Sequence, residues 1–234
     1  PAVAVAELMR VFVDEHGVPW DLAWKQTVAT LGYTNHTLLP EALERWPLPL
    51  FRRTLPRHAE LIAEIDRRFL RDVRDFFPAG GGHLQRMSIV SEGPDPQVRM
   101  AHLAVVGSHS VNGVAKLHSE LVQNELLADF RALYPERFNN KTNGVTPRRW
   151  LLGCNPGLAD LVTRTLGSSS WVTHLDELQG LEPALGNPSF LGELQAIKAA
   201  NKARLVPLIE QAIGVSVDPS SMFDVQIKRL HEYK

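Results

Sequence analysis

Basic side chains are concentrated at the end of the chain. Its last seven residues include Lys228, Arg229, His231 and Lys234. The stretch that leads into them, residues 222–228, alternates apolar and polar side chains, which predicts a strand with one buried face. Fixed cations at the end of a strand in an α/β sheet are well suited to bind an oxyanion such as phosphate. A solvated charge cluster is the alternative interpretation.

A second segment, residues 138–150, has side chains suited to a sugar. It combines three asparagines and three basic residues with a glycine and Trp150. An Asn amide donates and accepts hydrogen bonds, as a sugar hydroxyl does, and the indole of Trp150 offers a flat apolar face to a ring. The Asn-Gly pair at 143–144 predicts a turn, and the Thr-Pro pair at 146–147 predicts a helix start. A capped turn with exposed arginines is the structural alternative.

Hydrophobic periodicity and turn residues predict helices that alternate with short strands. Helices are expected at residues 5–15, 19–31, 40–46, 57–77 and 114–130, between Asn155 and Gly167, and between Asn187 and Gly214. Strands are expected at 87–90 and 222–228, with a loop at 91–97, while the apolar run at 100–106 fits either a strand or a helix. This alternation favours an α/β fold.

Composition excludes several classes of protein. The chain has 234 residues, 44% of them hydrophobic and 22% charged, which is typical of globular domains. A net charge of −1 gives no electrostatic basis for binding nucleic acid or an anionic membrane. Cys154 is the only cysteine, which fits a reducing compartment. No apolar run approaches the roughly 20 residues of a membrane span, and the first residues lack a signal-peptide pattern. We therefore expect a cytoplasmic protein without nucleic-acid or membrane partners.

Motifs for other chemistries do not fit. The glycines at 107 and 113 have the wrong spacing for a P-loop. The glycine run at 80–82 follows an expected helix rather than a strand, so it is not a dinucleotide-binding motif. No pair of histidines has the spacing of zinc ligands, and we expect no metal site.

Together, the two segments closely resemble the α-glucan phosphorylases, the family of glycogen, starch and maltodextrin phosphorylases. Further blocks that are similar to this family lie at residues 7–10, 33–37 with 40–44, 55–58, 107–116 and 154–158. They follow the family's order and cover nearly the whole chain. Because family members are several times longer, the resemblance implies an internal piece of a longer protein.

The family fold consists of two Rossmann-like domains that face a deep cleft, the glycosyltransferase B-type arrangement. The resemblance implies that residues 1–142 form the C-terminal part of the first domain. Residues 143–234 would then begin the second, cofactor-binding domain. Both walls of the cleft would contribute residues from this chain.

The resemblance also implies an activity. Family members use inorganic phosphate to cleave terminal α-1,4 glucosyl units from glycogen or maltodextrin, producing glucose 1-phosphate, and they are usually homodimers. Their pyridoxal 5′-phosphate acts through its phosphate, as a proton partner for the substrate phosphate. The lysine that binds this cofactor follows Lys234 in the family, and no matching motif occurs here, so the chain alone is expected to be inactive. Two alternatives are a nucleotide-sugar glycosyltransferase of similar fold and a non-catalytic glucan-binding relative.

On the phosphate side of the site, the resemblance assigns roles to individual residues. Arg229 and Lys234 are assigned as catalytic residues: Arg229 matches the residue that binds the substrate phosphate, and Lys234 matches a contact of the cofactor phosphate. Lys228 matches a second contact of the cofactor phosphate. Two phosphates in contact repel each other, so cations must surround them. The planar guanidinium of Arg229 suits the moving substrate because it holds two oxygens at once. Trp150 would lie close to the cofactor.

On the sugar side, the resemblance assigns His36 as a catalytic residue. It matches the histidine that hydrogen-bonds the glucose 6-hydroxyl and whose main-chain oxygen polarises the reacting centre. Asn143 matches another contact of the 6-hydroxyl, and Tyr233 matches a contact near the 2-hydroxyl. Val114 would lie against the sugar, and Thr37 belongs to the same sugar-binding stretch as His36.

Overall fold

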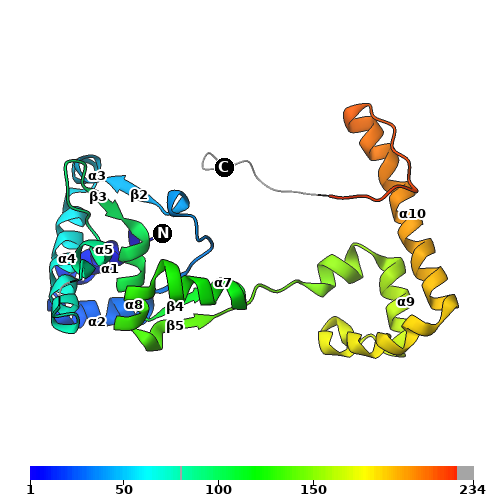
Figure 1. Ribbon diagram of the computed structural model, residues 1–234, viewed down its shortest axis with the longest axis horizontal. Coiled ribbons are helices and arrows are strands. Elements are labelled where there is room, and N and C mark those ends of the chain that lie inside the picture. Colours follow the sequence, from blue (N-terminus) through cyan, green and yellow to red (C-terminus); the bar gives the residue numbers. More distant parts are fainter. Residues whose placement is uncertain (80, 226–234) are drawn as a thin grey trace. The chain divides into compact units, whose positions relative to one another are not determined.

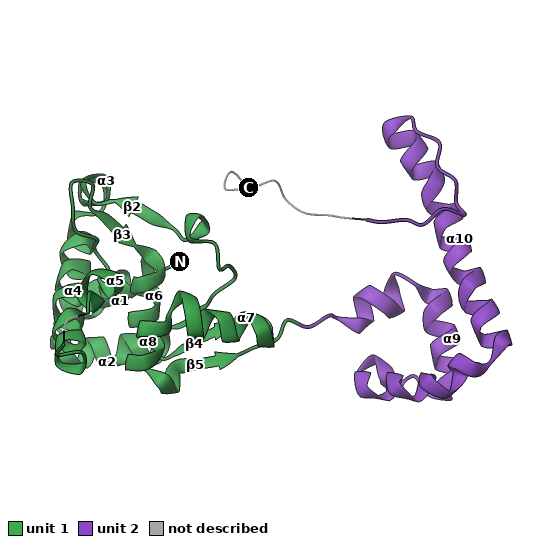
Figure 2. Cartoon of the chain, in the orientation of Figure 1, with its two compact units in different colours: residues 1–143, 232–234 green, residues 144–231 purple. Residues whose placement is uncertain are grey.

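The computed structural model describes residues 1–79 and 81–225 (Figure 1). The chain divides into two compact units, the first formed by residues 1–143 and the second beginning at Gly144 (Figure 2). Helices α1 to α8 and all the strands of the described part belong to the first unit, while α9 and α10 belong to the second. The mixture of helices with a parallel sheet confirms the predicted α/β class.

The helices of the first unit are mostly short. They are α1 (Ala4–Arg10), α2 (Trp20–Thr30), α3 (Leu48–Thr54), α4 (Pro56–Phe76), α5 (His83–Met87), α6 (Met100–Val106), α7 (Lys116–Leu121) and α8 (Ala128–Leu133). A π-helical segment continues α1 through Val11–Glu15, and another continues α7 through Val122–Leu126. The helices predicted at 5–15, 19–31 and 57–77 are confirmed. The run at 100–106 is helical, and the stretch 114–130 contains α7, its π-helical continuation and the first half of α8.

A three-stranded parallel sheet organises this unit. Its strands are β1 (Gly32–Thr34), β4 (Ser110–Gly113) and β5 (Phe138–Asn140), in the order β1-β4-β5. Tyr33 lies opposite Val111, which in turn lies opposite Phe138. A separate antiparallel pair joins β2 (Arg45–Pro47) to β3 (Gln97–Arg99). Because all three strands of the parallel sheet run the same way, their carboxyl ends lie along one edge.

Helix α4 supplies much of the core. Its apolar residues recur at helical spacing and form the predicted stripe, with Leu61, Ile62, Ile65, Phe69 and Val73 all buried. The rings of Phe69 and of a buried phenylalanine in α8 stack with their centroids 5.8 Å apart. Burial of this stripe removes apolar surface from water and is the main favourable term for the unit.

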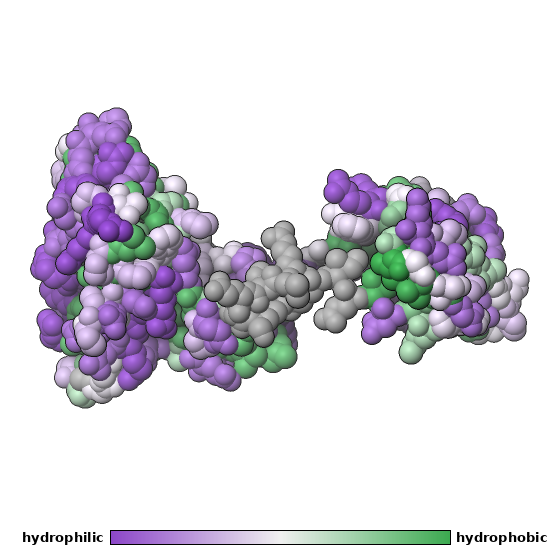
Figure 3. Space-filling model, turned by 90° about the horizontal axis from the view of Figure 1, so that it is seen from above, coloured by the Kyte–Doolittle hydropathy of each residue, from purple (hydrophilic) through white to green (hydrophobic). Residues whose placement is uncertain are grey.

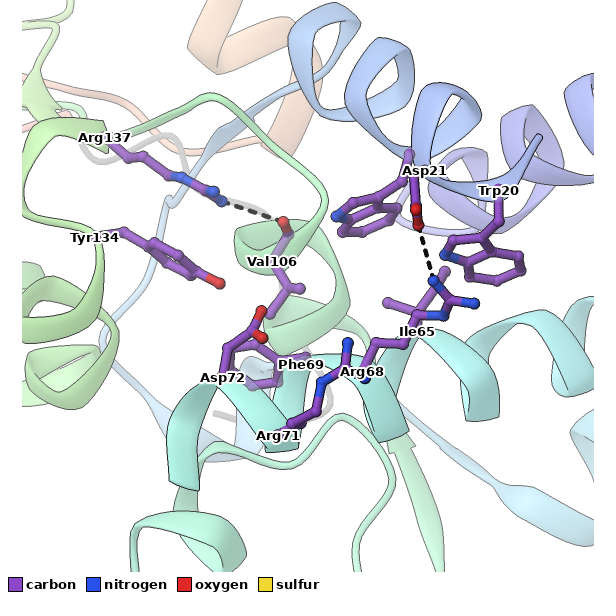
Figure 4. A pocket seen from close by; sticks show the side chains of 11 residues that line it. Trp20, Asp21, Ile65, Arg68, Phe69, Arg71, Asp72, Val106, Tyr134 and Arg137 are labelled. Carbon is purple, nitrogen blue, oxygen red and sulfur yellow. Dashed lines mark hydrogen bonds and ion pairs between the residues drawn. The ribbon is translucent and has the colours of Figure 1, made fainter. Parts of the chain in front are cut away.

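A small cavity of about 140 Å³ lies beside this core, between α2, α4 and the segment after α8. Arg137 lines it, and its Nη1 donates to the carbonyl of Val106 at 3.2 Å (Figure 4). The same nitrogen donates to the carbonyl of Ser108 at 3.1 Å. The guanidinium of Arg137 also lies 3.7 Å from the centre of the Tyr134 ring. Burial raises the pKa of the Tyr134 hydroxyl to about 12. Arg137 therefore ties the start of β5 to the end of α6.

The described residues of the second unit form helices and loops, without a strand. It contains α9 (Pro156–Leu166) and α10 (Pro188–Ile213), with 3-10 turns at Ser170–Val172 and Leu175–Gly186. Its small core is centred on Trp171, whose indole N–H donates to Thr163 Oγ1 at 3.0 Å. The predicted ends are confirmed, since Gly167 and Gly214 both adopt φ of 71° at the ends of their helices. Hydrophobic surface is visible on both units (Figure 3).

Three predicted elements are wrong over the described residues. In the helix expected at 40–46, only Pro40–Ala42 forms a helical turn, because the residues that follow pair as β2 with β3. At 87–90, Met87 ends α5, and only Val90 pairs with a strand, through an isolated antiparallel bridge to Val98 of β3. The backbone N–H groups of Ile89 and Val90 instead donate to the carboxylate of Asp66 at 2.7 and 3.2 Å. Residues 222–225 form no strand, and the remainder of the predicted strand at 222–228 lies outside the described residues.

Candidate functional site

The carboxyl edge of the parallel sheet brings several predicted sugar-binding residues to one place. Strand β1 leads into His36 and Thr37, β4 leads into Val114, and β5 leads toward Asn143. Neighbouring strands lie about 4.8 Å apart, so the three loops leave the sheet within roughly 10 Å of one another. In open α/β sheets, ligands bind outside the carboxyl ends of the strands. This edge is therefore the candidate site of the first unit.

A buried asparagine fixes the loop that carries His36. Asn35 is only 1% exposed, and its backbone N–H donates to the Asn112 carbonyl at 2.8 Å, which extends the pairing of β1 with β4. Its side-chain oxygen accepts the N–H of Thr37 at 3.0 Å, and its amide nitrogen donates to the Tyr33 hydroxyl at 3.1 Å. The backbone on both sides of His36 is thus fixed by hydrogen bonds. Its own side chain is exposed and makes no hydrogen bond with the described residues.

A cavity of about 530 Å³ opens beside this loop. His36 and Thr37 are among the polar residues that line it, and Tyr33, Leu43 and Met100 are among the more apolar ones. Cavities of a few hundred Å³ with an apolar lining and a few polar groups are typical of small-molecule sites. Val114 and Asn143 do not line this cavity; they lie farther along the strand edge.

The turn after β4 holds Val114 and Asn143 together. The carbonyl of Val114 accepts the backbone N–H of Asn143 at 2.9 Å. The backbone N–H of Val114 donates to Nδ1 of His118 at 3.1 Å. One residue earlier, the carbonyl of Gly113 accepts the N–H of Lys141 at 3.2 Å. The loops after β4 and β5 are therefore joined through their backbones.

Two more asparagines, Asn112 and Asn140, stabilise the same edge. Thr34 Oγ1 donates to the side-chain oxygen of Asn112 at 2.9 Å. Ser119 Oγ donates to that of Asn140 at 2.7 Å, and the Asn140 amide donates to Thr142 Oγ1 at 2.9 Å. Sequence reasoning missed these residues, together with Asn35 and His118. The signal that could have revealed the asparagines is their position at or next to the end of each parallel strand, where an amide can bond backbone and side chains in adjacent loops. No such signal marks His118.

We expect Gly113→Ala to destabilise this edge. A Cβ atom at this position would lie 2.8 Å from Ser119 Cα and 2.9 Å from His118 Nδ1, so backbone atoms would have to move. Overpacking of this kind costs about 1–3 kcal/mol. Thermal unfolding should show a lower Tm for Gly113→Ala. Gly32→Ala is the matched control, because its Cβ would meet only the Ser110 carbonyl oxygen at an ordinary 3.7 Å. Equal melting temperatures for the two variants would contradict the close packing of this turn.

The remaining predicted site residues do not belong to the described strand edge of the first unit. Trp150 lies in the second unit, in a π-helical segment (Arg148–Gly153), and is 63% exposed. Lys228, Arg229, Tyr233 and Lys234 lie outside the described residues. The phosphate side of the site therefore stays a prediction.

Within residues 1–79 and 81–225, no group of three or more His, Cys, Asp and Glu side chains is arranged to hold a metal ion. No helix in these ranges is long and apolar enough to cross a bilayer.

Comparisons with known proteins identify the family of the chain. The family model described as carbohydrate phosphorylase matches residues 1–234. The chain is 53% identical to glycogen phosphorylase of Synechocystis sp., 50% identical to the brain form of Bos taurus and 50% identical to the liver form of Homo sapiens. Each comparison covers the whole of this chain but only 27–28% of the relative, so the chain spans little more than a quarter of the length of these proteins. The chain belongs to the carbohydrate phosphorylase family.

Proposed function

We propose that a protein containing this chain is an α-1,4-glucan phosphorylase, a glycosyltransferase that moves terminal glucosyl units of glycogen or maltodextrin to inorganic phosphate. The observation that carries this proposal is the carboxyl edge of the parallel sheet. There, the residues that match the family's sugar contacts lie in neighbouring loops, in a chain about 50% identical to proteins named glycogen phosphorylase. The product would be glucose 1-phosphate.

The domain assignment belongs to the same proposal. Residues 1–142 would complete the first Rossmann-like domain, and residues 143–234 would begin the second, cofactor-binding domain. The whole protein would be a cytoplasmic homodimer, as the family generally is. Its partners would be the α-1,4-glucan and inorganic phosphate.

On the sugar side, His36 would act in two ways. Its imidazole would hydrogen-bond the 6-hydroxyl of the glucosyl unit, for which its exposed position and lack of a partner among the described residues leave it available. Its main-chain carbonyl would face the reacting carbon, where positive charge develops in the transition state. Asn143 and Tyr233 would bind further hydroxyls, and Val114 would pack against the ring. Thr37 would complete this side, since its N–H is fixed by Asn35.

On the phosphate side, the donor set fits pyridoxal 5′-phosphate at its phosphate end. Lys228 and Lys234 would hold the cofactor phosphate, Arg229 would hold the substrate phosphate, and Trp150 would lie near the cofactor ring. When bound, this cofactor supplies a phosphate group that exchanges a proton with the substrate phosphate. The three cations would offset the repulsion between the two phosphates. No segment of the chain matches the family's cofactor-binding lysine motif.

The activity of a full-length protein that contains this chain tests the proposal. With maltodextrin and inorganic phosphate, we expect glucose 1-phosphate to form, and its formation to require phosphate. Glucosyl transfer from a nucleotide sugar, without phosphorolysis, would favour a glycosyltransferase of similar fold instead. Binding of maltodextrin without any turnover would identify a non-catalytic glucan-binding relative.

The chain by itself is expected to be inactive. Residues 1–234 lack a match to the cofactor-binding lysine motif and span little more than a quarter of the relatives' length. Purified alone, the chain should release no glucose 1-phosphate from maltodextrin, and it should show no pyridoxal absorbance that is lost on borohydride reduction. Either signal from the pure chain would refute this expectation.

A further inference from the structure

His118 is a half-buried titratable residue next to the candidate sugar-binding edge. It lies in α7, one turn after β4, and its Nδ1 is 3.1 Å from the backbone nitrogen of Val114. Because that nitrogen can only donate, Nδ1 must accept and therefore carries no proton. The ring is then the neutral tautomer with its proton on Nε2.

The second ring nitrogen of His118, Nε2, argues that the residue does more than fill space. Nε2 is buried and has no hydrogen-bond partner in the part of the chain that the structure describes. A buried donor without a partner is costly, and an apolar side chain of similar size would fill the same space without that cost. The contribution that a leucine could not replace is the acceptor at Nδ1.

Nδ1 of His118 is linked through the backbone to the loops after β4 and β5. His118 fixes the N–H of Val114, and the carbonyl of Val114 accepts the N–H of Asn143 at 2.9 Å. The residue after His118 reinforces the same arrangement, since Ser119 Oγ donates to the Asn140 side chain at 2.7 Å. A change at His118 is therefore transmitted to both loops that carry Val114 and Asn143.

We propose that His118 is a positioning residue of the glucan site, which holds the Val114 turn, and through it Asn143, by means of the acceptor at Nδ1. This inference rests on the proposed function. His118 itself need not touch the glucan, because its described contact is with the backbone of the turn.

Three variants in the full-length protein separate the acceptor from the bulk of the ring. His118→Asn keeps an oxygen at the position of Nδ1, His118→Gln places its amide one bond farther from the backbone, and His118→Leu fills space without an acceptor. We expect Gln and Leu to lower kcat/KM for maltoheptaose by about ten-fold or more, and Asn to stay within about three-fold of the wild type. The KM for phosphate should change little in all three variants. Similar losses for Asn, Gln and Leu, or losses that only follow the fraction of folded protein, would overturn the proposal.

A binding measurement distinguishes a failure of this inference from a failure of the proposed function. If the wild-type protein releases no glucose 1-phosphate, the proposed function fails, and the affinity of the same variants for maltoheptaose is measured by calorimetry. His118→Asn should then bind more tightly than His118→Leu by about ten-fold. Equal affinities of the two variants would overturn the positioning role, whatever reaction the protein catalyses.

Discussion

Replacing His36 by alanine in the full-length protein is expected to slow turnover by roughly 30- to 1,000-fold, which corresponds to about 2–4 kcal/mol. The glucosyl unit becomes cation-like in the transition state, and the main-chain carbonyl of residue 36, which alanine retains, stabilises that charge selectively only when the ring is held against it. Alanine removes the imidazole that would hold the ring there through its 6-hydroxyl. The loss should therefore be larger in kcat than in glucan affinity. Asn143→Ala should cause a milder loss, because a sugar hydroxyl can partly re-pair with water.

The matched control for this prediction is His16→Ala. His16 is also exposed on the first unit, but it follows the π-helical segment after α1 rather than a strand of the parallel sheet. Both kcat and Tm should be measured on the same preparations. A normal kcat with a lowered Tm for His36→Ala would remove His36 from the active site and give it a structural role.

Arg229→Lys should lower turnover at saturating glucan by at least about ten-fold, or about 1.4 kcal/mol. Lysine keeps the charge but loses the planar fork that holds two phosphate oxygens at once. The content of pyridoxal phosphate should change little, because the cofactor phosphate is assigned to Lys228 and Lys234.

Arg52→Lys provides the control for this second prediction, since Arg52 is an exposed arginine of α3 and should tolerate the change. Phosphate kinetics that are the same for Arg229→Lys and the wild type would refute the role of Arg229. A loss of cofactor from Arg229→Lys would instead place this arginine on the cofactor phosphate.

Long amphipathic helices could be predicted from the sequence, and very short strands could not. The stripe of α4 repeats over 21 residues, so its period is unambiguous. Strands β1 and β5 have three residues each and β4 has four, which is too short for alternation to be recognised. At β2, strand pairing overrides the helical preference that the sequence suggested, since residues 45–47 pair with β3 instead of extending a helical turn.

In the candidate site, too, some residues could be predicted from the sequence and others could not. His36, Thr37, Val114 and Asn143 were assigned through a family resemblance that rests on contiguous motifs. Asn35 and His118 were missed because their contacts depend on structure that no motif records. The backbone of Asn35 bonds Asn112, which lies 77 positions later, only because β1 and β4 pair in this register. His118 reaches the Val114 N–H only because α7 begins directly after the turn.

The most direct test of the central claim is a crystal structure of the full-length protein with a maltooligosaccharide and phosphate bound. The account predicts that the terminal glucosyl unit lies at the carboxyl edge of β1, β4 and β5, with its 6-hydroxyl within hydrogen-bond distance of His36 and Asn143 and its ring against Val114. A glucosyl unit bound elsewhere, with this edge covered by another segment of the protein, would contradict it.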